Sequence, residues 1–308
     1  MNEPTILRWA AGAQTPIGST VDLDGETLLQ AALRHKLTGR LLHRIERDAP
    51  PWITAEIVDG LRDQQMSIQR GFERRLEQVS DIAAALTSYP DPLGVLKGIT
   101  TFVLTGHDRG IRHSNDIDLL WTDPDALKQT LLGLGYRDSD DFCRDHEYAS
   151  LYFENLNADI HRYFPVPSIA DGLVAVDLDP AAHAGRWEGL TAMNEHRVGY
   201  TDLREDSVIA AIAGFNVVVA DASLAVFLLC VHSFREYCHT PVLLPYATMR
   251  LGELCEIRDL MALPSFKPRR LRSLVERFNG GEAMRYAAFL MRSQLGTPIL
   301  TMYENGHP

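Results

Sequence analysis

Two aspartates separated by one apolar residue, Asp116 and Asp118, begin the segment DIDLLW. The segment predicts a β-strand, in which residues two apart share a face and lie roughly 6.5 to 7 Å apart along the backbone. Two carboxylates on one face repel each other by about 3 kcal/mol at ~5 Å in an effective dielectric of about 20. A bound divalent cation reverses the sign of that energy. Magnesium typically takes one or two such carboxylates together with substrate phosphates. Considered alone, the tripeptide also fits two solvated acids at a strand edge.

A third aspartate, Asp159, lies in the segment NADIHRYF, which predicts a neighbouring strand. Alternation along this strand places Asp159 and His161 on one face. Three carboxylates on adjacent strands are the set that a two-metal, in-line phosphoryl displacement requires. In that arrangement the third carboxylate helps to deprotonate the attacking hydroxyl. His161 is a candidate substrate-binding residue, although an ordinary structural histidine would give the same pattern.

Small and basic residues upstream of the aspartates could hold phosphates. Lys97-Gly98 lies between a predicted strand and a predicted helix, where free backbone N–H groups and the helix dipole favour an anion. Gly98 allows close approach of the chain, and Lys97 adds a point charge. Arg112 and Ser114 directly precede the aspartates and could clamp a triphosphate. Taken singly, each feature also fits an ordinary turn or a solvated loop.

Three regions are expected to position these residues. Residues 1–90 form a helical N-terminal region, 91–205 an α/β core with a small mixed sheet, and 206–308 a helical C-terminal region that closes the cleft. Within them the patterns predict helices in 26–46, 53–88, 124–135, 221–237, 248–263, 267–278 and 282–294, and a hairpin formed by 147–154 and 157–164. Residues 165–205 are weakly patterned and are expected to be rich in loops.

The composition is that of an ordinary soluble protein of 308 residues, with 45% hydrophobic and 23% charged residues. The net charge is −11, and such an acidic surface repels a phosphate backbone, so extended nucleic-acid binding is not expected. The most apolar run, residues 222–231, is shorter than the roughly 20 residues of a membrane span. The N-terminus lacks the pattern of a signal peptide. The four cysteines form no CxxC pair, which predicts reduced thiols in a cytoplasmic protein without a membrane partner.

These motifs together resemble the DNA polymerase β-like nucleotidyltransferase superfamily. The nearest resemblance is to bacterial uncharacterised nucleotidyltransferases, with a signature Leu-Lys-Gly, then Arg-x-Ser-x-Asp-hydrophobic-Asp, then Asp-hydrophobic-His. Here the signature occupies 96–98, 112–118 and 159–161. One departure is that the wider superfamily carries Gly-Ser or Gly-Gly where this chain has Lys97-Gly98. The sequence therefore leaves open which residues bind the triphosphate, whereas the three carboxylates are all present.

The resemblance implies an enzyme that transfers a nucleoside monophosphate from an NTP, with ATP as the expected donor, and releases pyrophosphate. It implies two magnesium ions held by Asp116, Asp118 and Asp159. The acceptor is expected to be a small molecule or a peptide. The alternatives are a toxin-like nucleotidyltransferase acting on RNA or protein, and a non-catalytic nucleotide-binding protein on the same fold. His232 and Asp259, in the helical C-terminal region, resemble substrate-side residues of such proteins.

Mutual repulsion within the aspartate cluster also predicts how the metal-free protein responds to substitution. Replacing Asp118 or Asp159 by Asn removes one of three crowded negative charges. On this ground, either variant is expected to fold with equal or slightly higher thermal stability while losing activity.

Overall fold

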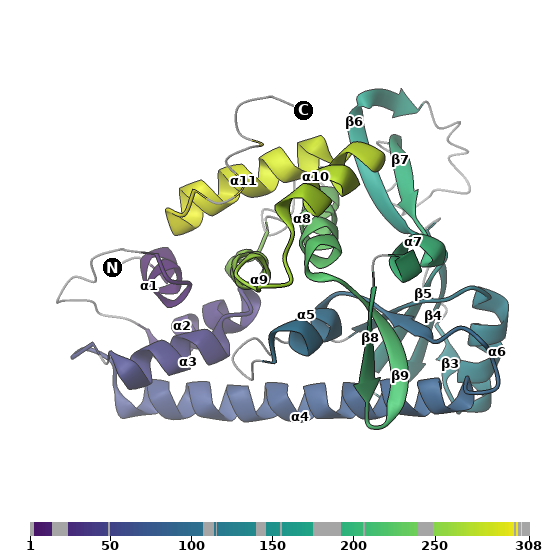
Figure 1. Cartoon of the computed structure of the whole chain (residues 1–308). Helices are drawn as coiled ribbons and strands as arrows, with labels where there is room; N and C mark the ends of the chain where they lie inside the picture. Colours follow the sequence, from purple (N-terminus) through teal and green to yellow (C-terminus); the bar gives the residue numbers. More distant parts are fainter. Residues whose placement is uncertain are drawn as a thin grey trace, which may run out of the picture.

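The computed structural model has the mixed α/β architecture that the sequence predicts (Figure 1). It describes residues 3–13, 24–48, 50–106, 114, 116–139, 146–154, 156–174, 192–205, 207–239, 249–298, 300 and 303. The helices are α1 (Glu3–Ala10), α2 (Gly25–Arg34), α3 (Thr38–Arg47), α4 (Ala55–Ala85), α5 (Gly98–Thr105), α6 (Pro124–Gly133), α7 (Tyr200–Glu205), α8 (Ala222–His239), α9 (Leu251–Met261), α10 (Pro268–Arg277) and α11 (Gly281–Leu295). The strands are β1 (Leu93–Val95), β2 (Asp116–Leu120), β3 (Arg137–Asp138), β4 (Glu147–Phe153), β5 (Leu156–His161), β6 (Phe164–Val174), β7 (Ala192–Val198), β8 (Ser207–Ile212) and β9 (Phe215–Ala220).

The described strands form a seven-stranded mixed sheet in the order β3-β4-β5-β2-β1-β9-β8, and a separate pair of β6 and β7. β2 is parallel to β5, and β1 is parallel to β9. β4 and β5 form the predicted antiparallel hairpin. Gly94 of β1 lies opposite Leu120 of β2, where a Cβ on residue 94 would be 2.5 Å from the Leu120 carbonyl oxygen. The absence of a side chain at Gly94 therefore lets β1 and β2 approach closely.

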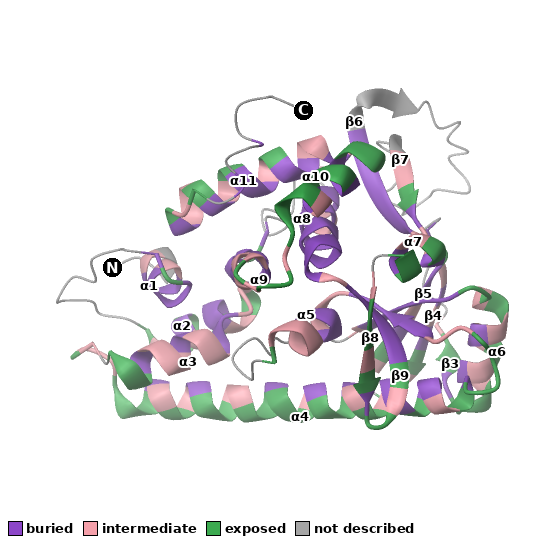
Figure 2. Cartoon of the chain, in the orientation of Figure 1, coloured by how far each residue is buried: buried purple, intermediate pink, exposed green. Residues whose placement is uncertain are grey.

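The long helix α4 joins the N-terminal helices to the sheet. Its buried residues recur at helical spacing along one face, from Ile57 and Leu61 to Val79 and Ile82. That face packs on α2 and α3 at one end and on α6, β8 and β9 at the other. Figure 2 shows the resulting alternation of buried and exposed turns along α4. The helix begins at the predicted place because the Thr54 side chain accepts a hydrogen bond from Ile57 N, which satisfies one free N–H of the first turn.

Helix α8 is the centre of the C-terminal helices. It packs against α9, α10 and α11 and also against β6, and most of its residues are buried (Figure 2). Burial on several sides explains why its sequence is apolar without a strong one-sided pattern. Among the helices that the structure describes, none combines the length and the apolar character that crossing a membrane requires.

Two parts of the sequence-based expectation were wrong. Residues 165–205 were expected to be rich in loops, but most of the described residues there, 165–174 and 192–205, belong to β6, β7 and α7; residues 175–191 lie outside the described residues. Residues from 206 onward were expected to be helical, but β8 and β9 extend the main sheet beyond β1. Their connection contains Ala213 and Gly214 with φ of 47° and 92°, the left-handed pair that joins tight hairpins. An Ala-Gly pair between two β-branched runs was the signal for this hairpin.

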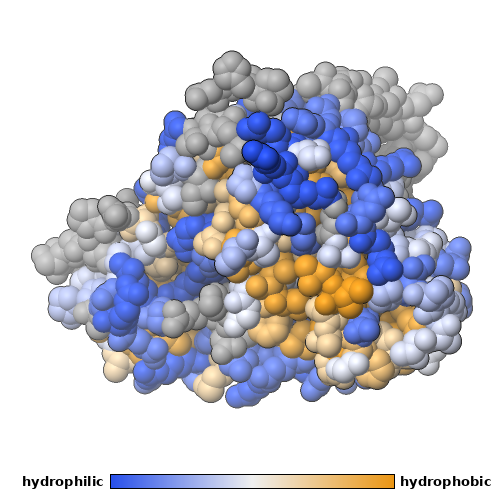
Figure 3. Space-filling view, in the orientation of Figure 1, coloured by the Kyte–Doolittle hydropathy of each residue, from blue (hydrophilic) through white to orange (hydrophobic). Residues whose placement is uncertain are grey.

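On the face shown in Figure 3, apolar side chains gather over α5 and β8. β8 is an edge strand of the sheet, and its Val208 and Ile209 are 39% and 59% exposed.

The three described cysteines, Cys230, Cys238 and Cys255, carry free thiols, as the cysteine pattern predicts, and burial raises the pKa of each. Cys143 lies outside the described residues.

Candidate active site

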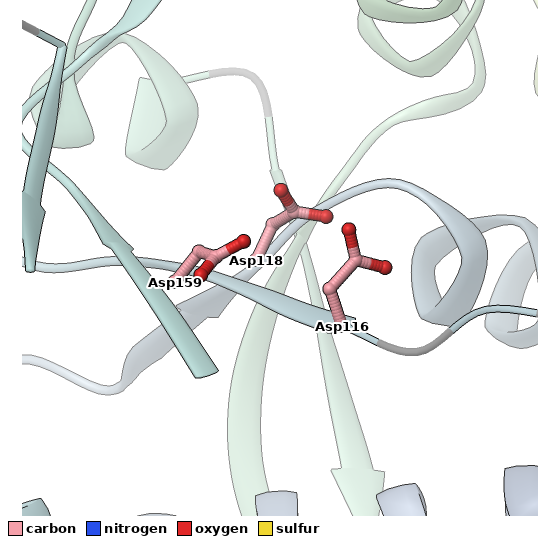
Figure 4. A group of neighbouring side chains, drawn as sticks. All are labelled: Asp116, Asp118 and Asp159. Atoms are coloured by element: carbon pink, nitrogen blue, oxygen red, sulfur yellow. The ribbon is translucent and has the colours of Figure 1, made fainter. Parts of the chain in front are cut away.

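The three aspartates converge on one side of the sheet (Figure 4). Asp116 and Asp118 lie on β2 and Asp159 lies on β5. The parallel pairing of these strands places Asp118 directly beside Asp159. One carboxylate oxygen from each residue lies within 4.8 Å of those of the other two. Hard oxygen donors at this spacing fit a divalent cation such as magnesium.

Asp118 is the most enclosed of the three, with 3% of its surface exposed. Its Oδ1 lies 2.6 Å from Lys97 Nζ and 3.0 Å from His161 Nε2. Burial acts to raise the pKa of Asp118, but the Lys97 ammonium and the His161 bond outweigh it and hold that pKa well below its usual range. The carboxylate of Asp118 is therefore ionised throughout the physiological range and is available as a metal ligand.

Asp159 has a different environment on the neighbouring strand. Its Oδ1 accepts a hydrogen bond of 2.6 Å from Ser150 Oγ on β4. Burial raises the pKa of Asp159 to about 6, and the negative charges of Asp118 and Asp116 act in the same direction against the Ser150 bond. A carboxylate with such a pKa can exchange a proton near neutral pH, which is the property of a general base.

Asp116 lies at the start of β2, two residues after Ser114. Ser114 Oγ donates a hydrogen bond to the Asp116 carboxylate. Arg75 of α4, 4% exposed, donates from Nη1 to the Ser114 carbonyl oxygen. Arg75 thereby ties Ser114 to the long helix. Arg112, the other residue expected to hold phosphate, lies outside the described residues.

Lys97 and Gly98 occupy the junction of β1 and α5, as the sequence predicts. Lys97 is the residue before the helix and has φ 54° and ψ −124°, a region that residues other than glycine rarely adopt. Gly98 begins the helix, so its backbone N–H is among those without a partner inside the helix. A pocket opens here against Ser114 and two of the aspartates, Asp116 and Asp118; its lining comprises Phe72, Arg75, Leu96, Lys97, Gly98, Ile99, Ser114, Asp116, Ile117 and Asp118.

A family of nucleotidyltransferases, described as uncharacterised, matches residues 22–296 of this chain. The chain belongs to this family. Among solved structures, the antibiotic-resistance factor ANT(2'')-Ia is similar at 16% sequence identity and a TM-score of 0.40. The match covers 72% of this chain and 97% of that chain. No curated protein matches this nucleotidyltransferase.

In this nucleotidyltransferase the histidine of the Asp-x-His motif contacts an aspartate. His161 is 3% exposed and bonds Asp118 through Nε2, and its other nitrogen, Nδ1, is buried with no hydrogen-bond partner among the described residues. His146 stacks on the His161 ring, with centroids 5.5 Å apart. Burial first of all, with the charges of Arg235 and His161, lowers the pKa of His146 to about 4 against the Glu147 bond. A neutral His146 therefore packs behind His161 and fixes the plane of its ring against Asp118.

The two candidate residues of the helical C-terminal region lie in different places. His232 of α8 packs near Phe164, with ring centroids 6.3 Å apart. Burial lowers the pKa of His232 well below its usual range, and the Lys97 charge adds to this effect, so His232 is near the site as a neutral group. Asp259 of α9 instead forms an ion pair with Arg40 of α3 at 2.6 Å, and this contact joins the C-terminal helices to the N-terminal ones.

Three residues of the site carried no motif in the sequence analysis. Ser150 could have been found by counting back from the hairpin turn, because β4 pairs Ser150 with Asp159. Arg75 and His146 are brought to the site by α4 and by the segment before β4. No local pattern in the sequence distinguishes Arg75 from the solvated arginines of the same helix.

Proposed function

We propose that this enzyme transfers a nucleoside monophosphate from a magnesium-bound NTP to an acceptor hydroxyl or phosphate and releases pyrophosphate. The observation that carries the proposal is the approach of Asp116, Asp118 and Asp159 to within 4.8 Å of one another on adjacent strands. Among the described residues, Lys97 and His161 contact Asp118, and the three carboxylates repel one another at this spacing. A divalent cation is the partner that makes such a cluster favourable.

The donor set fits magnesium, because all three ligands are carboxylate oxygens. When bound, a pair of such ions would polarise the attacking and leaving oxygens of an in-line displacement. Asp116, Asp118 and Asp159 would hold the ions. Ser114, Ser150 and His161 each bond one of these carboxylates and so fix the orientation of the ligand oxygens.

The chemical step moves one proton and exchanges one bond. The acceptor oxygen forms a bond to the α-phosphorus while the bond from that phosphorus to the bridging β-phosphate oxygen breaks, and pyrophosphate leaves. The acceptor's proton passes to water, assisted by Asp159, which would hold the ion beside the attacking oxygen. The free N–H groups at Gly98, together with Ser114 and Arg112, are proposed to bind the phosphates of the NTP.

The acceptor class follows from charge. With a net charge of −11, the enzyme repels long polyanions. A small molecule or a peptide is therefore the proposed acceptor, and ATP the first donor to test. RNA and folded protein, the acceptors of a toxin-like enzyme, are the alternatives that the same experiment examines.

Labelled transfer tests this function directly. The wild-type enzyme is incubated with Mg²⁺, each α-³²P-labelled NTP in turn and a cell extract separated into small-molecule, peptide, RNA and protein fractions. We expect label in the small-molecule or peptide fraction, and its loss with the isosteric variants Asp118→Asn and Asp159→Asn. Equal labelling by wild type and both variants would refute the proposed site, and label confined to the RNA or protein fraction would replace the acceptor assignment.

A further inference from the structure

The Lys97 ammonium occupies the aspartate cluster itself. Nζ lies 2.6 Å from Asp118 Oδ1, and the two side chains are 16% and 4% exposed. The same oxygen also contacts His161 Nε2 at 3.0 Å. One of the two oxygens of the central aspartate is thus already bonded to a cation, in a place shielded from water where an ion pair is only weakly screened.

The backbone at Lys97 has a conformation that favours glycine. With φ 54° and ψ −124°, a side chain at this position carries a steric cost that glycine would avoid. The adjacent residue, Gly98, has no such requirement, because it is the first residue of α5. The strained position is therefore occupied by Lys97, whose charge reaches the carboxylates. The ion pair of Lys97 with Asp118 offsets the steric cost of its backbone conformation.

A lysine and a divalent cation cannot both occupy this cluster at full contact. Asp118 and Asp116 both attract the Lys97 charge, and their oxygens lie within 4.8 Å of each other and of Asp159. A cation bound among these oxygens would approach Nζ closely, and two positive charges at that separation repel each other. Because Asp118 Oδ1 already contacts Lys97, an ion that binds this oxygen competes with the ammonium for it.

We propose that Lys97 is the internal cation of the metal-free enzyme, and that a divalent ion enters the triad by displacing its ammonium from Asp118. This inference rests on the proposed function, because it takes the triad as the metal site. A nucleotide would give the displaced ammonium a new anionic partner, since its phosphates are proposed to bind beside Gly98. Metal alone consequently binds weakly, and metal and NTP strengthen each other's binding.

Binding of Mn²⁺ without nucleotide tests the competition. Its dissociation constant is measured by calorimetry for wild type, Lys97→Met, Asp118→Asn and a charge-matched control, Lys128→Met. Lys128 also pairs with an aspartate at 2.6 Å, Asp138, but on α6 and β3. We expect Lys97→Met to bind Mn²⁺ about tenfold more tightly or better, the scale of one lost charge-assisted contact. Lys128→Met should match wild type.

The outcomes separate the two proposals. Unchanged or weaker Mn²⁺ binding in Lys97→Met, or equal tightening in Lys128→Met, overturns the displacement while the metal site stands. Measurable and equal Mn²⁺ binding by wild type and Asp118→Asn, or none by both wild type and Lys97→Met, overturns the metal site itself and with it the proposed function.

A second measurement uses the wild-type chain and does not depend on a variant that folds poorly. The sequence contains four lysines, Lys36, Lys97, Lys128 and Lys267, so lysine labelled with ¹³C at Cε gives a simple spectrum. The Lys97 signal is identified by its absence in Lys97→Arg. Saturating Mg²⁺ is expected to move the Lys97 signal and to leave that of Lys128 in place. A Lys97 signal that stays fixed while Mg²⁺ binds would refute displacement.

Discussion

Asp118 and Asp159 are direct neighbours in register on the parallel strands β2 and β5, yet their environments shift their pKa values in opposite directions. Lys97 and His161 hold the pKa of Asp118 well below its usual range against the effect of burial. Burial raises that of Asp159 to about 6. Two carboxylates whose environments separate their pKa values are suited to different tasks. Here Asp118 is the permanent anion, and Asp159 is the group that can take up a proton.

The first prediction concerns Asp118→Asn. Loss of a ligand from a two-metal site should reduce turnover by about a thousandfold or more, equivalent to several kcal/mol of transition-state stabilisation. The repulsion argument from sequence predicts an unchanged or higher stability, but the structure predicts the opposite. The substitution leaves the Lys97 ammonium buried without its carboxylate, which costs about 3–5 kcal/mol. Thermal unfolding in EDTA should show a clearly lower melting temperature, and an unchanged one would show that the ion pair is not formed.

Asp159→Asn makes the same isosteric change on the neighbouring strand and is compared with Asp118→Asn. It should lose turnover to a similar extent. Its metal-free stability at pH 8 should equal or exceed that of wild type, because the substitution removes a negative charge that burial disfavours and that Asp118 and Asp116 repel. The contrast between the two isosteric changes is the informative measurement. Equal destabilisation by both would show that the triad is a structural cluster.

The pH dependence of the metal-free enzyme follows from Asp159. Its pKa is raised from an ordinary value of 3.8 to about 6 by burial, so between these values the folded state binds more protons than the unfolded state. The contribution of Asp159 to stability is therefore fully present below about pH 4 and is lost as pH rises to about 6. The loss is at most about 3 kcal/mol. The difference in unfolding free energy between wild type and Asp159→Asn, measured in EDTA across this range, should change by that amount.

Ser150 is predicted to be a positioning residue for Asp159. Its hydrogen bond lowers the pKa of Asp159, so Ser150→Ala should move the acidic limb of the kcat/KM profile to higher pH. It should also reduce kcat by about tenfold, a typical share for one oriented group in acid–base chemistry. Ser150→Thr keeps a hydroxyl and should restore the wild-type profile. An unchanged pH profile in Ser150→Ala would limit Ser150 to a role in strand packing.

Arg112→Ala tests the phosphate site. One charge-assisted contact is worth roughly 1.5 to 3 kcal/mol, so NTP affinity should fall by about one to two decades. Arg137→Ala, on the exposed strand β3, removes the same charge away from the site and should leave affinity unchanged. Calorimetry with Mg-ATP measures both, and equal affinity in all three proteins would show that the loop of Arg112 is only solvated.

The sequence by itself predicted a nucleotidyltransferase and its three candidate carboxylates. The spacing in Asp116-Ile117-Asp118 places two carboxylates on one strand face, and the pattern of NADIHRYF predicts Asp159 on a neighbouring strand, whereas the parallel pairing of β2 and β5 that sets Asp159 beside Asp118 belongs to the fold. The Lys97-Gly98 junction and the Arg-x-Ser-x-Asp pattern predicted the family, and the match over residues 22–296 confirms that family. These features are local, so periodicity and turn chemistry are sufficient to predict them.

Only the tertiary structure decided how the charges are balanced. β9 pairs with β1 across a long stretch of chain, and α4 brings Arg75 to the loop before Asp116. The backbone conformation of Lys97 at the junction of β1 and α5 sets the direction of its side chain. In that direction the Lys97 ammonium lies against Asp118. Contacts of this kind depend on where separate elements meet, and the local periodicity of the sequence does not predict those meeting points. The sign of the stability change in Asp118→Asn therefore follows from the fold and not from the motif.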